Sequence, residues 1–127
     1  MNIIGIGIDA TDIPRIDQAI KRFGDRFTQR VFTEAEIAYC STKHRAAQHY
    51  AARFAAKEAA MKAIGTGLTH GVTWRDIEVV REGGPPRLVF RGAALRHFQR
   101  LGASYSLLTI THSDALAFAQ VLLARKE

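Results

Sequence analysis

AAQHYAARFAAKEAAMKAIGTG, residues 46–67, is the stretch that decides the fold. Strong helix formers dominate it, and no proline or glycine occurs before Gly65, so it predicts one long helix that ends at Gly65 and Gly67. Alanine occupies nine positions from Ala46 to Ala63. The predicted helix is therefore small and apolar nearly all round, which is typical of a helix that lies inside a domain.

Charged side chains nevertheless occur in the centre of this helix. Phe54, Glu58 and Lys62 follow one another at steps of four and share one face, while Arg53 and Lys57 form an adjoining row. Spacing alone leaves two interpretations open. One is a Glu58–Lys62 pair on the helix surface, worth about 0.2–0.5 kcal/mol. The other is a carboxylate with flanking cations that holds a metal ion and a polyphosphate.

Length and composition limit the possible classes of protein. The 127 residues are enough for one domain, with one cysteine, Cys40, and therefore no internal disulfide. No apolar run is long enough to span a membrane, and the N-terminus lacks the charged region of a signal peptide, so we expect a cytoplasmic protein. The net charge of +6 and the pI near 10.0 favour anionic partners: nucleic acid, an acidic protein or a phosphorylated small molecule.

The remaining segments predict an α+β domain. We expect strands at 3–8, 77–81, 87–90, 106–111 and 116–123, helices at 14–23 and 92–101, a short irregular or helical piece near 27–32, and a helix from the Thr33–Glu36 capping box to Ser41. This order predicts a largely antiparallel sheet. The apolar first strand is expected to be buried on both faces and to end at Asp9.

Two polar residues stand out at the expected ends of strands. A carboxylate at the end of a buried strand is costly unless it is paired. Asp12 suits the cap of the helix that begins at Pro14 better than Asp9 does, which leaves Asp9 for another purpose. His112 ends an apolar strand at a turn, where spacing favours capping or packing at least as much as catalysis.

Three segments together resemble the holo-[acyl-carrier-protein] synthases, the short 4′-phosphopantetheinyl transferases. They are GIGIDATDIPRI (5–16), RFAAKEAAMKAIGTG (53–67) and LTITHSD (108–114). The resemblance covers essentially the whole chain, 1–127, and implies the fold of that family, a largely antiparallel sheet packed on a long central helix. Ala10 and Thr11 stand where the family usually has larger aliphatic side chains, whereas Asp9, Asp12 and Arg15 keep their places.

The resemblance implies a reaction and roles for individual residues. The 4′-phosphopantetheine arm of coenzyme A would pass to a serine of an apo acyl carrier protein, in support of fatty acid biosynthesis, and release adenosine 3′,5′-bisphosphate. Asp9 and Glu58 match the acids that bind Mg²⁺, an ion that prefers oxygen ligands. The implied catalytic residues are Glu58, Lys62 and His112. The implied coenzyme-binding residues are Arg53, Lys57, Lys62, Gly65, Thr66, Gly67 and His112. The general base stays open between Glu58 and a metal-bound water.

The resemblance also implies partners. Arg15 and Arg22 match positions that the family presents to the acidic carrier protein, and family members form homotrimers with active sites at subunit junctions. Two other classes compete: a non-catalytic nucleic-acid binder, which the charge alone favours, and a magnesium-dependent nucleotide hydrolase. Because the aromatic residues follow apolar stripes and no nucleic-acid-binding motif is visible, we expect no nucleic-acid partner, and we expect no membrane partner.

Overall fold

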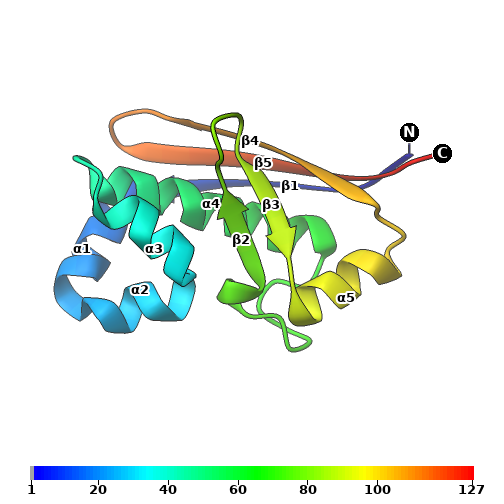
Figure 1. Ribbon diagram of the computed structural model, residues 1–127, viewed down its shortest axis with the longest axis horizontal. Helices are drawn as coiled ribbons and strands as arrows, with labels where there is room; N and C mark the ends of the chain where they lie inside the picture. Colours follow the sequence, from blue (N-terminus) through cyan, green and yellow to red (C-terminus); the bar gives the residue numbers. More distant parts are fainter. Residues whose placement is uncertain (1) are drawn as a thin grey trace.

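A 19-residue helix, α4 (Ala46–Ile64), lies against a three-stranded antiparallel sheet in the computed structural model, which describes residues 2–127 (Figure 1). The strand order is β1 (Asn2–Asp12), β5 (Leu116–Arg125) and β4 (Tyr105–His112). Eleven side chains of α4 are buried, most of them alanines. The predicted interior helix is therefore confirmed, and both apolar core clusters include residues from it.

The other elements pack around α4 in two groups. Helices α1 (Ile13–Phe23), α2 (Asp25–Val31) and α3 (Glu34–Ser41) gather at one end (Figure 1). A two-stranded antiparallel sheet of β2 (Ile77–Val80) and β3 (Arg87–Phe90) follows a 3₁₀ turn at Trp74–Asp76 and precedes α5 (Gly92–Arg100). This arrangement confirms the predicted α+β class. Within residues 2–127, no helix has the length and apolar character needed to cross a membrane.

Local sequence signals fix the ends of several helices as predicted. The Asp12 side chain accepts a hydrogen bond from the Arg15 backbone N–H at 3.3 Å and caps α1. Thr33 and Glu36 form the reciprocal capping box of α3. Gly65 ends α4 in the left-handed region, at φ = 80°.

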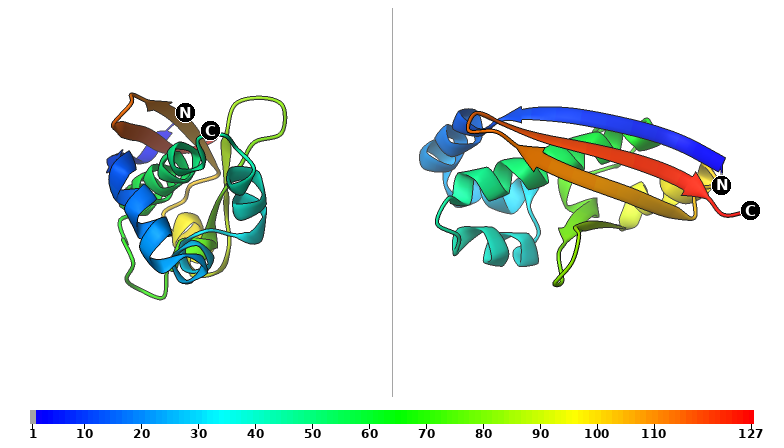
Figure 2. Two further views of the ribbon diagram at one scale, coloured as in Figure 1. Left: turned by 90° about the vertical axis from the view of Figure 1, so that its left-hand side faces the viewer. Right: turned by 90° about the horizontal axis from the view of Figure 1, so that it is seen from above.

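Strand β1 differs from its prediction in length and in exposure. It continues to Asp12, so Asp9 lies within the strand and not at its end. Burial on both faces was also wrong for the single chain: Ile3, Ile6 and Ile8 are 63%, 59% and 62% exposed. Helix α4 covers one face of the sheet, whereas the opposite face is open, as the view from above shows (Figure 2). Continuous apolar character could not distinguish a covered face from an open one.

The covered face of β1 rests on α4 through glycine. A Cβ atom added to Gly7 would lie 1.9 Å from the carbonyl oxygen of Ala59, and one added to Gly5 would lie 2.3 Å from that of Ala63. Both distances are far inside van der Waals contact. The two glycines therefore allow the strand backbone to lie directly on the helix backbone.

This contact gives a prediction for stability. We expect Gly7→Ala to lower the free energy of unfolding by about 3 kcal/mol, because the added methyl meets backbone that has no room to move. Gly84→Ala is the matched control, since nothing lies within 4 Å of its added Cβ and its φ is not left-handed; we expect a change within about 0.5 kcal/mol. Urea unfolding at equal protein concentration measures both. Equal stability of the two variants would contradict the direct backbone contact.

Candidate active site

A cavity of about 400 Å³ opens where β1 passes into α1 beside α4. We call it the carboxylate cavity, because Asp9 and Glu58 both line it. The other lining residues are Ala10, Thr11, Asp12, Arg15, Ile16, Ala19, Phe27 and Phe54. The structure thus brings together two acids that are 49 positions apart in the sequence (58 − 9), as the predicted metal site requires.

Both carboxylate oxygens of Asp9 have partners. The Lys62 ammonium contacts Oδ1 at 3.2 Å and also donates to the Ile8 carbonyl oxygen at 3.0 Å. The Thr11 hydroxyl donates to Oδ2 at 2.7 Å. Lys62 therefore pairs with Asp9 on β1, and the structure contains no Glu58–Lys62 ion pair within residues 2–127. The interpretation of Glu58 and Lys62 as a simple surface pair was wrong.

Glu58 lies in a different environment. Its carboxylate makes no hydrogen bond or ion pair with the residues that the structure describes. Burial raises the pKa of Glu58, the negative charge of Asp9 raises it further, and Lys62 partly opposes both effects. Two carboxylates in one partly buried cavity repel each other, so the site favours an added cation.

The donor set of the cavity fits Mg²⁺. Magnesium is commonly held by one or two carboxylates, with substrate phosphates and water completing its shell. Within residues 2–127 there is no group of three or more His, Cys, Asp or Glu side chains that could enclose a metal ion. Asp9 and Glu58 could therefore hold an open site, but not an enclosed one, and an open site leaves positions for phosphate oxygens.

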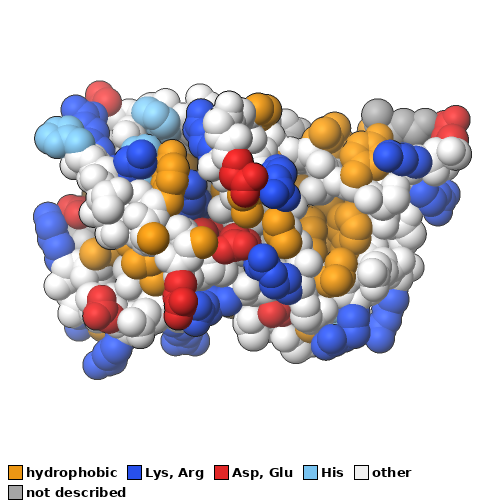
Figure 3. Space-filling model, viewed as in Figure 1, with side chains coloured by type: hydrophobic (Ala, Val, Ile, Leu, Met, Phe, Trp, Pro, Cys, Tyr) orange, Lys and Arg blue, Asp and Glu red, His pale blue; other side chains and the backbone are white. Residues whose placement is uncertain are grey.

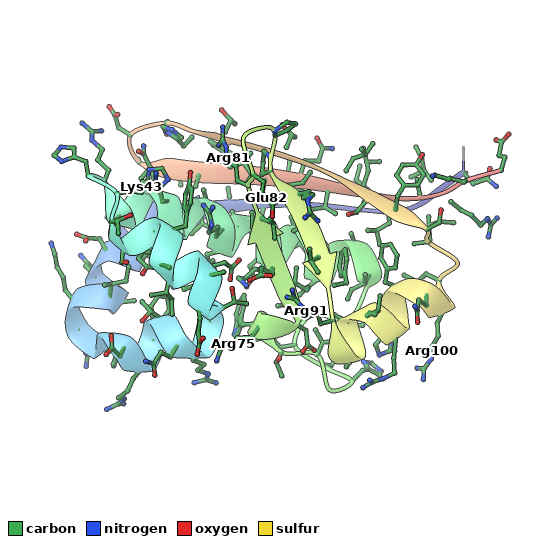
Figure 4. All side chains as sticks on the ribbon, viewed as in Figure 1. Lys43, Arg75, Arg81, Glu82, Arg91 and Arg100 are labelled. Carbon is green, nitrogen blue, oxygen red and sulfur yellow. The ribbon has the colours of Figure 1, made fainter. Side chains whose placement is uncertain are left out.

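A second cavity, of about 390 Å³, is lined by Arg53, Arg81, His49 and His112; we call it the arginine cavity. Arg81 reaches it from the segment between β2 and β3 (Figure 4). The remaining lining residues are Tyr39, Gln48, Ala52, Val79, Pro86, Ile110 and Thr111. Burial, and then the charge of Arg53, lower the pKa of His49.

Arg53 and His112 each have a close neighbour in the arginine cavity. The Arg53 guanidinium lies 4.1 Å from the centre of the Tyr39 ring, and its buried Nε has no hydrogen-bond partner within residues 2–127. The His112 Nδ1 atom lies 2.8 Å from Gln48 Nε2 on α4. Arg53 and Arg81 both line this cavity, so its positive charge favours an anionic ligand.

The two cavities lie on opposite sides of α4 and share no lining residue. Phe54 and Glu58 face the carboxylate cavity, whereas Gln48, Ala52 and Arg53 face the arginine cavity. At about 100° per residue, the two sets point away from each other around the helix axis. The resemblance implied that Glu58, Arg53 and His112 serve one site at a junction between subunits, and the single chain places them in two cavities.

Lys57 lies in neither cavity. Its side chain is fully buried, its ammonium pairs with Glu36 Oε1 at 2.7 Å, and it donates to the carbonyl oxygens of Trp74 and Ile77. All three donor positions of the ammonium can thus be occupied within the core. The prediction that Lys57 lines the coenzyme pocket was wrong, because its side chain joins α4 to α3 and β2.

The other predicted site residues lie near the surface. Arg15 is exposed at the edge of the carboxylate cavity. Arg22 is exposed on α1, with its guanidinium 5.2 Å from the Phe23 ring centre. The Gly65–Thr66–Gly67 turn follows the end of α4 and lines neither cavity. Thr11 was not among the predicted site residues; its place two positions after Asp9 on a strand would have put both side chains on one face.

Comparison with known proteins shows the family to which this chain belongs. A sequence model of the 4'-phosphopantetheinyl transferase superfamily matches residues 5–119. The chain belongs to that superfamily. The holo-[acyl-carrier-protein] synthase of Koribacter versatilis is 55% identical over 122 residues, which cover 95% of this chain and 98% of that protein.

Solved structures agree. The holo-[acyl-carrier-protein] synthase of Neisseria meningitidis has a TM-score of 0.88 at 31% identity, covering 97% of this chain and 99% of its own. That of Bacillus anthracis, in complex with CoA (3',5'-ADP), has a TM-score of 0.80 at 35% identity, covering 99% and 100%. The predicted family and fold are therefore confirmed.

The contrasting positions of Lys57 and Lys62 give a prediction. We expect Lys57→Ala to lower the free energy of unfolding by about 3–5 kcal/mol, because it leaves Glu36 buried and unpaired. Lys62→Ala, on the same helix, should cost about 1 kcal/mol or less, because the Lys62 side chain is 53% exposed. Urea unfolding compares the two variants. A Lys57→Ala protein that unfolds like the wild type would contradict the structural role of Lys57.

Proposed function

We propose that this protein transfers the 4′-phosphopantetheine group of coenzyme A to a serine of an apo acyl carrier protein. The products are the holo carrier protein and adenosine 3′,5′-bisphosphate. The family membership and the similar synthases, one of them in complex with CoA, support this reaction. The observation that carries it to these residues is that Asp9 and Glu58 line one cavity and that the Lys62 ammonium contacts Asp9.

Each residue of the group has a part in the proposed transfer. Asp9 and Glu58 would hold Mg²⁺, which would supply positive charge to offset that of the bisphosphate leaving group. Lys62, half-exposed beside Asp9, places its ammonium toward the coenzyme phosphates. Glu58 has a raised pKa and no hydrogen-bond partner within residues 2–127, so its carboxylate is free to accept the serine proton, directly or through a water.

The second group of predicted residues completes the coenzyme site in this proposal. Arg53 and His112, which both line the arginine cavity, bind an anionic group of the coenzyme there. The Gly65–Thr66–Gly67 turn contributes backbone N–H groups beyond Lys62, at the end of α4.

The proposed reaction is tested by the intact mass of an apo carrier protein after incubation with this protein, coenzyme A and Mg²⁺. We expect a gain of one phosphopantetheine. Asp9→Ala and Glu58→Gln should each reduce the rate by at least about 100-fold, since each removes a charged ligand or base.

Cleavage of coenzyme A without carrier protein would instead indicate a hydrolase that uses the same acids on water. A rate in Glu58→Gln close to that of the wild type, at ordinary Mg²⁺ concentration, would contradict the role proposed for Glu58.

The carrier protein binds the exposed surface of α1 in this proposal. Arg15 and Arg22 are exposed there, and Arg15 also lines the carboxylate cavity, so a docked carrier would have its serine close to Asp9 and Glu58. Lys and Arg side chains surround the end formed by α1, α2 and α3, on the left in Figure 3. A basic surface steers an acidic partner toward it.

A homotrimer with shared active sites is part of the same proposal. Two observations support it. The open face of the sheet carries a row of aliphatic side chains, since Ile6 pairs with Leu122 and Leu122 pairs with Leu107 across three strands. Ile6 and Leu107 are 59% and 51% exposed, and an exposed apolar face of this kind is typical of an interface. The two cavities, separate in one chain, could meet across a junction between chains.

Mixing two inactive variants tests the shared site. Asp9→Ala damages the carboxylate cavity and His112→Ala the arginine cavity, so each variant alone should be inactive. Each trimer that contains both variants has one junction of its three that combines two intact cavities, so we expect about a third of the wild-type rate. The measurement is carrier-protein modification by co-purified mixed trimers. A mixture as inactive as its separate components would contradict a site shared between chains.

A cytoplasmic location and a place in fatty acid biosynthesis complete the proposal. Burial raises the pKa of the Cys40 thiol to about 11, so the one cysteine stays protonated and unreactive. A free, buried thiol is compatible with a reducing compartment.

A further inference from the structure

The two acids of the carboxylate cavity differ in how firmly the protein holds them. Asp9 has a partner on each oxygen, Lys62 at 3.2 Å and Thr11 at 2.7 Å. Glu58 has none within residues 2–127. One acid is therefore oriented by the folded chain, while the other stays free to adjust.

The two partners of Asp9 are unlike each other. The Lys62 side chain is long, flexible and 53% exposed, and the proposed function directs its ammonium to the coenzyme phosphates as well. Thr11 is buried, at 7% exposure, on the rigid strand that also carries Asp9. Its hydroxyl has a single hydrogen, which is already donated to Oδ2. When coenzyme phosphates compete for the Lys62 ammonium, the Lys62–Asp9 contact can be lost, whereas the Thr11–Asp9 hydrogen bond stays in place.

We propose that Thr11 is a positioning residue that fixes the orientation of the Asp9 carboxylate for the metal ion. This inference rests on the proposed function, in which Asp9 is a ligand. The terminal torsion of an aspartate is broad, so a carboxylate without a hydrogen bond rotates freely. With Oδ2 held by Thr11, the remaining lone pairs face the cavity in a fixed direction. Partners that orient a metal ligand in this way typically change metal affinity by about 10- to 100-fold when removed.

A purely structural role for Thr11 is the competing explanation. Thr11 pairs with the buried Ala117 of β5, so its methyl group could simply fill space beneath the sheet. Two substitutions separate the explanations. Thr11→Val keeps the shape and removes the hydroxyl, whereas Thr11→Ser keeps the hydroxyl and removes the methyl.

The test measures metal binding directly. Mn²⁺ replaces Mg²⁺ as the probe, because it prefers the same oxygen ligands and its free ion is quantified by electron paramagnetic resonance. With the full chain and saturating coenzyme A, we expect Thr11→Val to raise the dissociation constant for Mn²⁺ by about 10-fold or more. Thr11→Ser should stay within about threefold of the wild type. Urea unfolding of each variant checks that the fold is intact.

The outcomes distinguish this inference from the proposed function. If Thr11→Val binds Mn²⁺ like the wild type while Asp9→Asn loses binding, Asp9 is a ligand and Thr11 does not position it. If Asp9→Asn also binds like the wild type, the metal role of Asp9 itself is wrong and the inference falls with it. Equal weakening in Thr11→Val and Thr11→Ser would assign the effect to packing and would overturn the hydroxyl's role.

Discussion

The contact between the backbones of β1 and α4 is the constraint on which the site depends. Gly5 and Gly7 leave the helix-facing side of the strand without side-chain atoms where it crosses the helix, and Ala59 and Ala63 of α4 meet it there. This close approach lets Asp9, the next inward-facing residue, reach Lys62. Because backbone meets backbone at these glycines, no side chain there can move to accommodate a shift of β1 or α4. We therefore regard the glycine pattern of the first motif as part of the geometry of the candidate active site, although neither glycine carries a functional group.

The charged side chains of helix α4 project in different directions around the helix axis. Lys57 and Glu58 are adjacent in sequence, yet one is fully buried against Glu36 and the other lines an open cavity. A turn of about 100° between neighbours is enough to separate them. A helix buried nearly all round can carry charged residues only where each charge finds a partner or an opening. Lys57 pairs with Glu36 in the core, whereas Glu58 faces the carboxylate cavity.

The sequence predicted what depends on local chemistry and missed what depends on packing between distant elements. The caps at Asp12 and Thr33 and the stop at Gly65 follow from hydrogen bonds within a few residues, and all three are confirmed. The burial of Lys57 depends on Glu36 and on two carbonyl groups of the chain after α4, which no helical spacing reveals. The exposure of Ile6 and its neighbours on the outer face of β1 depends on which sheet face the helices cover. Family resemblance supplied the pairing of Asp9 with Glu58, because 49 positions separate them (58 − 9).

Association of several chains would account for both the open sheet face and the separation of the two cavities. A single chain leaves a row of aliphatic side chains in water and the positive charges of Arg53 and Arg81 at one cavity. Each of these features is unfavourable in isolation. Association through the sheet would remove the first, and an anionic ligand shared between neighbouring chains would remove the second. The assembly and the coenzyme would then stabilise each other, because each supplies contacts that the separate chain lacks. On this argument, coenzyme binding should strengthen the association of the chains as well as occupy their sites.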